Sequence, residues 1–145
     1  MNSNFYEADL RKALCKEIES RRIRELGDSS PFFVQLAKLY PTNGSKIDWA
    51  RVPDSIERVE NEDALQAEQF AKFFDEVIQK FRLSGEVVYI GDSATDFALI
   101  GSLECMSEAL SKLLAVPQHH YLIGSDFSWC ICFTMEGNMG FGFHM

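Results

Sequence analysis

The sequence predicts an α+β fold, in which an antiparallel sheet from the C-terminal half is covered by N-terminal and central helices. Residues 118–145 alternate with the two-residue period of half-buried strands, and two glycine-containing turn signals divide them. Residues 62–82 instead carry aromatic side chains at the spacing of an amphipathic helix. With 145 residues, of which 46% are hydrophobic, the chain can bury one core, so we expect a single domain over residues 1–145.

The N-terminal segment is predicted to form one helix over residues 4–26. Apolar residues recur at every fourth position and would form its buried stripe: Leu10, Leu14 and Ile18. Ser3 can cap this helix, and Gly27 is its natural end. The arginines of the last turn would then be exposed at the helix end: Arg21, Arg22 and Arg24.

The next segment is predicted to be a short helix followed by irregular chain. Pro31 favours a helix that covers residues 32–39, because proline is tolerated in the first turn. Residues 46–60 show no regular pattern. Trp49 in this segment could contact a partner, but we expect it to pack on the core.

The central helix has the clearest periodicity of the chain. We expect it over residues 62–82, with Asn61 as its cap. Its apolar positions follow the helical repeat and should lie across the sheet: Phe70, Phe73, Phe74, Val77, Ile78 and Phe81.

The C-terminal half is predicted to supply the sheet. Residues 86–90 form an apolar strand, residues 91–95 a loop and residues 96–100 a short return strand. Ser102 should cap a helix that ends near residue 115. Three antiparallel strands then follow: residues 118–123, 127–135 and 138–144.

The charge balance is acidic, with a formal net charge of −8. Residues 1–26 hold six basic and five acidic side chains, whereas residues 27–145 hold eight basic and 17 acidic ones. Such a surface repels phosphates, so we expect no nucleic-acid partner. The acidity can simply serve solubility, or it can attract a basic partner. We find no signal peptide and no membrane-length apolar run, so we expect a cytoplasmic protein without membrane contact.

The cysteines at 130 and 132 share one face of a predicted strand. With a histidine they could bind a metal ion, but their spacing lacks the turn of zinc sites and no second pair exists. We therefore expect small core residues and neither a metal nor another cofactor.

The loop Gly91–Thr95 permits two enzymatic interpretations. Gly-Asp-Ser occurs in serine esterases, with Ser93 as nucleophile, but the Asp-x-x-His pair that would activate it is absent. Asp92 and Asp96 match the magnesium-binding loop of haloacid dehalogenase phosphatases, but the chain has no N-terminal Asp-x-Asp nucleophile. No catalytic residue is therefore assigned, and a small hydrolase that uses Ser93 and Asp92 is an alternative, with His119, His120 or His144 as base.

Two stretches resemble bacterial immunity proteins, the antidotes to toxins of contact-dependent growth inhibition and other polymorphic toxin systems. The stretches read YIGDSATDF, at residues 89–97, and QHHYLIGSDFSWCICFTMEGNMGFGF, at residues 118–143. The second is similar to a closing hairpin in these families through a set of spaced residues: Asp126, Ser128, Trp129, Cys130, Thr134, Glu136, Gly137, Phe141 and Gly142. The resemblance implies a protein without enzymatic activity that binds one cognate toxin C-terminal domain, often a nuclease.

The acidic balance fits such a basic partner independently of the resemblance. We predict a toxin-binding surface of loop and helix-start carboxylates: Asp92, Asp96, Asp126, Glu136, Glu60, Glu62 and Asp63. Asp92, Asp126 and Glu136 could instead only shape their turns. An interaction domain without a toxin partner is a further alternative.

Overall fold

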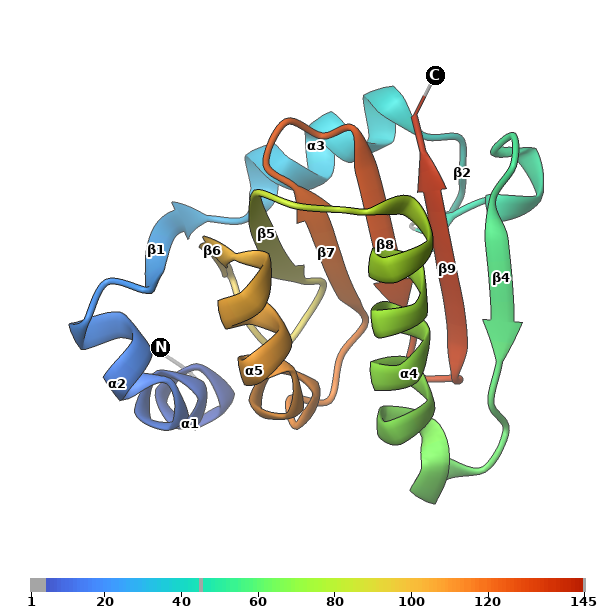
Figure 1. The fold of residues 1–145 in the computed structure, drawn as a ribbon. Coiled ribbons are helices and arrows are strands. Elements are labelled where there is room, and N and C mark those ends of the chain that lie inside the picture. Colours follow the sequence, from blue (N-terminus) through green and yellow to red (C-terminus); the bar gives the residue numbers. More distant parts are fainter. Residues whose placement is uncertain (1–4, 45, 145) are drawn as a thin grey trace.

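The chain forms a seven-stranded antiparallel sheet in a computed structural model that describes residues 5–44 and 46–144 (Figure 1). The strand order is β1-β6-β5-β7-β8-β9-β4. The inner strands come from the C-terminal half: β5 (Glu86–Gly91), β6 (Phe97–Ser102), β7 (His120–Gly124), β8 (Trp129–Phe133) and β9 (Asn138–Phe143). The edges come from the N-terminal half: β1 (Ile23–Asp28) and β4 (Ile56–Val59). The predicted α+β class is thus confirmed.

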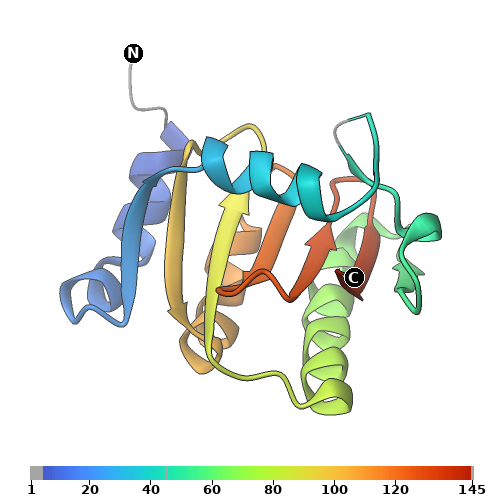
Figure 2. The same cartoon turned by 90° about the horizontal axis from the view of Figure 1, so that it is seen from above.

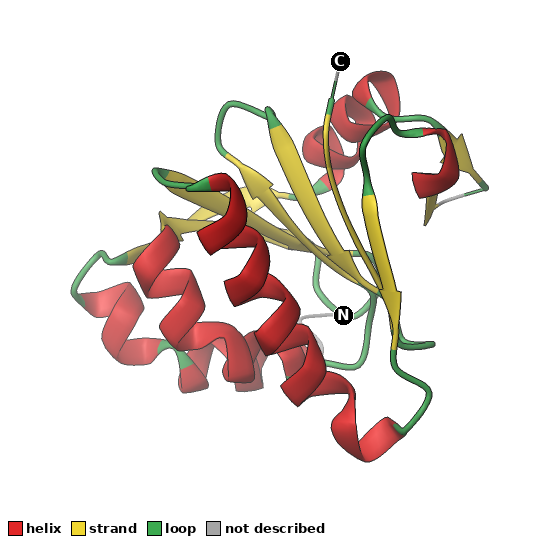
Figure 3. Cartoon of the chain, turned by 45° about the vertical axis from the view of Figure 1, so that its right-hand side comes forward, coloured by secondary structure: helices red, strands yellow, loops and turns green. Residues whose placement is uncertain are grey.

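Helices cover both faces of this sheet. Figures 2 and 3 show most helices on one face of the sheet and α3 (Ser30–Leu39) on the other. The first face carries α1 (Phe5–Ala13), α4 (Asp63–Phe81) and α5 (Leu103–Leu114), with α2 (Cys15–Glu19) beside α1. The second face carries α3 (Ser30–Leu39), the hairpin of β2 (Thr42–Asn43) and β3 (Lys46–Ile47), and the one-turn helix η1 (Trp49–Arg51).

The first face, called the helix face below, holds the larger apolar cluster. The aromatic stripe of α4 lies on the sheet as predicted, and the ring of Phe70 stacks on Phe133 at 4.6 Å between centroids. Phe73, Phe74 and Val77 are buried in the same cluster. Full burial of such a side chain contributes about 1.5–3 kcal/mol, so the stripe fixes α4 on the sheet.

The second face, called the α3 face below, is also buried, which the sequence did not predict. Strands β7 and β8 alternate as expected, but each residue of both strands is buried. Leu36 and Tyr40 from α3 and the chain just after it, together with Trp49, cover this face. The expectation of half-buried strands was therefore wrong, because α3 and its neighbours form a second layer.

Trp49 lies against β9 and is buried, as predicted. A methyl group on Gly140 would overlap the indole, so the glycine gives the ring its place beside the strand. The hydroxyl of Tyr40, whose ring packs edge-on against Trp49, donates to the carbonyl of Gly142 at 2.9 Å. The glycines of β9 thus let an aromatic layer approach the backbone closely.

The predicted helix over residues 4–26 is wrong in its last part. The chain leaves the helix after Glu19, Arg21 adopts a positive φ of 63°, and Ile23 begins edge strand β1. Ile23 is fully buried opposite Gly101 of β6, so sheet pairing prevails over the local helical pattern. The arginines therefore lie around an edge strand, and Gly27, with φ of 84°, takes part in a bulge of β1. Ser3 lies outside the described residues.

The segment 46–60 is more regular than predicted, because it contains β3, η1 and edge strand β4. The cap of α4 was also misplaced: Glu62 is the N-cap, and its backbone N–H donates to the Glu60 carboxylate at 3.1 Å. Ser102 does cap α5, since its hydroxyl accepts from the Cys105 backbone N–H at 3.1 Å.

Within the described part of the chain, no helix has the length and apolarity to cross a membrane.

Candidate functional site

The strand pairing brings most of the predicted site residues to one end of the sheet. Gly91 lies opposite His120, His120 opposite Phe133, and Phe133 opposite Met139. The connections beyond these pairs therefore meet at one end, which we call the loop end: residues 60–63, 92–96, 117–119 and 134–137. Six of the seven predicted residues lie there, whereas Asp126 lies in the β7–β8 turn at the opposite end.

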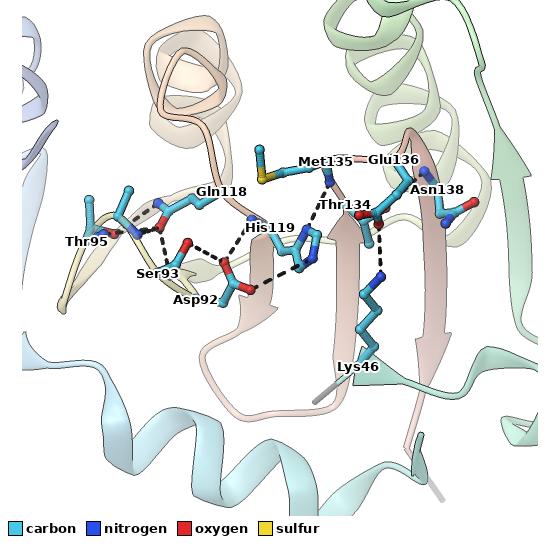
Figure 4. A network of polar contacts seen from close by, with 11 residues as sticks. Lys46, Asp92, Ser93, Thr95, Gln118, His119, Thr134, Met135, Glu136 and Asn138 are labelled. Carbon is cyan, nitrogen blue, oxygen red and sulfur yellow. Dashed lines mark hydrogen bonds and ion pairs between the residues drawn. The ribbon is translucent and has the colours of Figure 1, made fainter. Parts of the chain in front are cut away.

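Gln118 organises the β5–β6 connection at the loop end (Figure 4). Its side chain is buried, and the carboxamide oxygen accepts from the backbone N–H groups of Ser93, Ala94 and Thr95 at 3.3, 2.8 and 3.1 Å. Its NH₂ group donates to the hydroxyls of Thr95 and Tyr89, each at 3.0 Å. A fully bonded buried amide fixes the loop, because each lost bond would leave a polar group unsatisfied.

A buried histidine extends this network on the helix face. The Tyr89 hydroxyl receives a bond from Gln118, so its own proton goes to His120 Nδ1 at 2.7 Å. The imidazole is then neutral with its proton on Nε2, and burial lowers the pKa of His120 to about 4. Burial also raises the pKa of Tyr89. These groups serve as a neutral polar support.

Asp92 connects the β5–β6 loop to the start of β7. Its Oδ1 accepts from the His119 backbone N–H at 2.9 Å and from the Ser93 hydroxyl at 3.2 Å. The His119 ring is partly exposed: its Nδ1 accepts from the Met135 backbone N–H at 2.9 Å, and its Nε2 lies 4.0 Å from Asp92 Oδ2. His120, the next residue, is buried, whereas His119 is only partly buried.

This order of groups does not match the hydrolase alternative. A serine nucleophile needs an imidazole beside its hydroxyl and a carboxylate behind the imidazole. Here the Ser93 hydroxyl donates to the carboxylate of Asp92, and His119 is beyond that carboxylate (Figure 4).

The second enzymatic interpretation needs Asp92 and Asp96 as metal ligands. Over residues 5–44 and 46–144, no group of three or more His, Cys, Asp or Glu side chains is placed to hold a metal ion.

The acidic side chains at the start of α4 lie at the surface and also have structural roles. Glu60 accepts from the Glu62 backbone N–H, and Asp63 Oδ1 accepts from the Gln66 side chain at 3.3 Å. Gln66 also donates to the Glu60 carbonyl at 3.1 Å. Negative charge at a helix N-terminus is favourable, so these carboxylates stabilise α4 while remaining at the surface.

Glu136 and Asp96 complete the acidic part of the loop end. Glu136 pairs with Lys46 of β3 at 2.9 Å, and this hydrogen bond lowers the pKa of Glu136. Both partners are about half exposed, so solvent weakens the pair. The Asp96 side chain is exposed, while its backbone N–H donates to the Glu7 carboxylate of α1 at 2.7 Å.

Three large apolar side chains are exposed among or next to these acids. Met135 is 55%, Val59 56% and Leu65 42% exposed. Met135 precedes Glu136 in the β8–β9 turn, and Leu65 lies in the first turn of α4. Acidic groups interspersed with exposed apolar side chains are suited to recognising a protein surface.

Asp126 does not join this surface. Its Oδ1 accepts from both the hydroxyl and the backbone N–H of Ser128, at 2.7 and 3.0 Å, and these bonds lower the pKa of the carboxyl. It shapes the turn before Trp129, as the turn interpretation of this residue expected. Its inclusion in one surface with the other six residues was wrong, since the β7–β8 turn is at the opposite end.

The cysteine pair belongs to the core, as predicted. Cys130 and Cys132 are buried on the α3 face with their sulfurs 3.8 Å apart. Burial raises the pKa of the Cys132 thiol well above its usual value.

Sequence reasoning missed Gln118 and Lys46 as parts of the loop end, and it considered His119 only as a catalytic base. Each is a polar residue beside a strand, which by itself resembles any loop residue. The one available signal was Gly91, whose missing Cβ leaves room for the Gln118 side chain. In comparisons with known proteins, no family model matches this chain, and no curated protein matches its sequence.

Proposed function

We propose that this protein is an immunity protein that binds a cognate toxin C-terminal domain and neutralises it by stoichiometric inhibition. The observation that carries the proposal is the composition of the loop end, where the carboxylates of residues 60, 62, 63, 92, 96 and 136 lie with the exposed side chains of Met135 and Leu65. The resemblance of residues 89–97 and 118–143 to immunity proteins supports the same class. In this proposal the protein acts in the bacterial cytoplasm without a cofactor.

The physical mechanism divides between charge and apolar contact. A net charge of −8 attracts a basic domain, such as a nuclease with a positive substrate groove, and accelerates encounter. Met135 and Leu65 would then be buried by the partner and slow dissociation, as apolar anchors do at protein interfaces. The rigid connections around Gln118 and His119 would hold the surface in its binding conformation, which lowers the entropy cost of association.

The first test is affinity capture of the tagged protein from its native cell, followed by mass spectrometry. We expect one stoichiometric partner that carries a toxic C-terminal domain, and co-expression with this protein should protect cells from that domain. A capture that yields no tight partner, or a partner whose toxicity is unchanged by co-expression, contradicts the proposal.

The second test locates the surface by binding kinetics with the captured domain. Reversing the charge of two acids, Glu62→Lys with Asp63→Lys, should slow association about tenfold at low salt and less above about 0.15 M salt. Met135→Ala should mainly accelerate dissociation. Asp126→Lys is the matched control at the opposite end and should have little effect. An equal effect of Asp126→Lys would place the interface elsewhere.

A further inference from the structure

Two adjoining cavities lie on the α3 face, and the smaller one reaches the exposed side chain of Val59 beside the loop end. The larger, of about 420 Å³, lies between α3 and the sheet, where Phe33, Leu36 and Tyr121 line it. The smaller, of about 290 Å³, extends past the β2–β3 hairpin toward β9 and β4. Ile47 and Tyr121 line both cavities, so the two adjoin at these residues. Their volumes are those of small-molecule pockets.

Tyr121 is the central polar group of this site. Its side chain is only 4% exposed and is held edge-on against Phe33 at 5.3 Å between ring centroids. Among the described residues its hydroxyl has no hydrogen-bond partner. This hydroxyl is not among the buried polar atoms that lack a partner in the described part of the chain, so it is open to the cavity, where a ligand can bond to it. Burial raises the pKa of Tyr121, so the hydroxyl stays protonated.

The charges around the cavities favour a cation. Asp92 lines the larger cavity, and its Oδ2 accepts no hydrogen bond from the described residues; the nearest ring nitrogen is His119 Nε2, at 4.0 Å. Glu57 lines the smaller cavity without a Lys or Arg partner in the described part of the chain. The other charged linings are paired, Lys46 with Glu136, Arg58 with Glu76, and Asp48 with Arg51.

We propose that these joined cavities bind a small organic cation, an amine with an aromatic body. Its ammonium group would bond to Asp92 Oδ2 and to the Tyr121 hydroxyl, and its body would pack against Phe33 and Leu36. This site shares Asp92 with the loop end, but it does not depend on the protein-binding function proposed above. The isolated chain suffices for its test, so the two proposals fail independently.

The test is an NMR titration of the full chain with a matched pair of probes, phenethylamine and 2-phenylethanol. The two differ by an ammonium group in place of a hydroxyl. We expect saturable shifts of the amides of Phe33, Asp92 and Tyr121 with the amine, and at least about tenfold weaker binding of the alcohol. No saturation by about 10 mM amine, shifts confined to other parts of the chain, or equal affinity for the alcohol would overturn the proposal.

Isosteric variants assign the contacts. Asp92→Asn keeps the Oδ1 acceptor for His119 but removes the charge, and it should weaken amine binding about tenfold without affecting the alcohol. Tyr121→Phe should weaken amine binding a few-fold. Asp126→Asn removes a charge at the opposite end and should change neither. Thermal denaturation checks that each variant is folded. Glu57→Gln, on the exposed edge strand, removes the charge that lines the smaller cavity. Wild-type amine affinity in Asp92→Asn would overturn the proposal, whatever the affinity of Glu57→Gln.

Discussion

The two faces of the sheet are covered by very different amounts of helix. On the helix face, the 19 residues of α4 and the 12 of α5 fill the surface with stacked rings and aliphatic side chains. On the α3 face, one helix of 10 residues and a short hairpin leave cavities of about 420 and 290 Å³. Cavities that border α4 are smaller, about 170 and 190 Å³. The long helix α4 fills its face of the sheet, whereas the shorter α3 leaves space that a ligand can occupy.

The largest expected effect tests this contrast directly. Phe70→Ala should lower the free energy of unfolding by about 3–5 kcal/mol, because the ring is fully buried against Phe133. Phe33→Ala is the matched variant on the α3 face and should cost less than about half as much, because Phe33 borders a cavity and is partly exposed. Urea denaturation of both variants measures the difference. Equal losses would mean that the faces are packed equally well.

The second effect concerns the polar network on the helix face. Burial lowers the pKa of His120 from 6.5 to about 4, so the unfolded chain binds a proton in this range before the folded one does. The contribution of neutral His120 to the free energy of unfolding is therefore fully present above pH 6.5. It is lost as the pH drops toward 4, by about 3 kcal/mol over the interval.

Two measurements check the role of His120. NMR titration of the ring should give a midpoint near 4. His120→Gln, which cannot titrate, should lose less stability than the wild type between these two pH values. A midpoint at the usual histidine value would show that the ring is not held neutral in the fold.

A third, smaller effect concerns the Trp49 layer of the α3 face. Gly140→Ala should cost about 1–3 kcal/mol, because the added methyl group would displace the indole. Trp49→Phe makes room for that methyl group, so the double variant should lose less than the sum of the single variants. Thermal or urea denaturation of all four proteins completes this cycle. Strict additivity would show that the glycine and the indole are independent.

The smallest effect compares two hydroxyls on the same face. Tyr121→Phe should change stability by less than about 0.5 kcal/mol, because this hydroxyl has no partner among the described residues. Tyr40→Phe should cost about 1 kcal/mol, because its hydroxyl donates to the Gly142 carbonyl. Denaturation measured under one condition separates them. A large loss for Tyr121→Phe would reveal a bond to that hydroxyl and weaken its assignment to a ligand.

The parts of the fold that the sequence predicted correctly are those with strong local periodicity. The stripe of α4, the Ser102 cap and the C-terminal strands depend on neighbouring residues, which a pattern can show. Strands β1 and β4 were missed because they are edge strands whose partners, β6 and β9, are far along the chain. Ile23 did carry a signal, since it falls five positions after Ile18 and breaks the four-residue repeat.

The candidate site was predictable in composition and only partly in geometry. Acidic loops could be identified, and six of the seven proposed residues share one end of the sheet. Asp126 was misplaced because the reversal of direction between β7 and β8 puts their turn at the other end. Gln118 and Tyr121 could not be selected, because a long-range hydrogen bond and an unfilled cavity depend on packing that no local pattern encodes.

The strand order also has a consequence for biosynthesis. Strand β1 pairs with β6, and β4 pairs with β9, so each edge strand leaves the ribosome long before its partner is translated. Residues 56–59 must therefore remain unpaired until residues 138–143 have been made. The sheet cannot be completed during synthesis of the first half of the chain, and the nascent protein acquires its native edge only when almost all of this sequence has emerged.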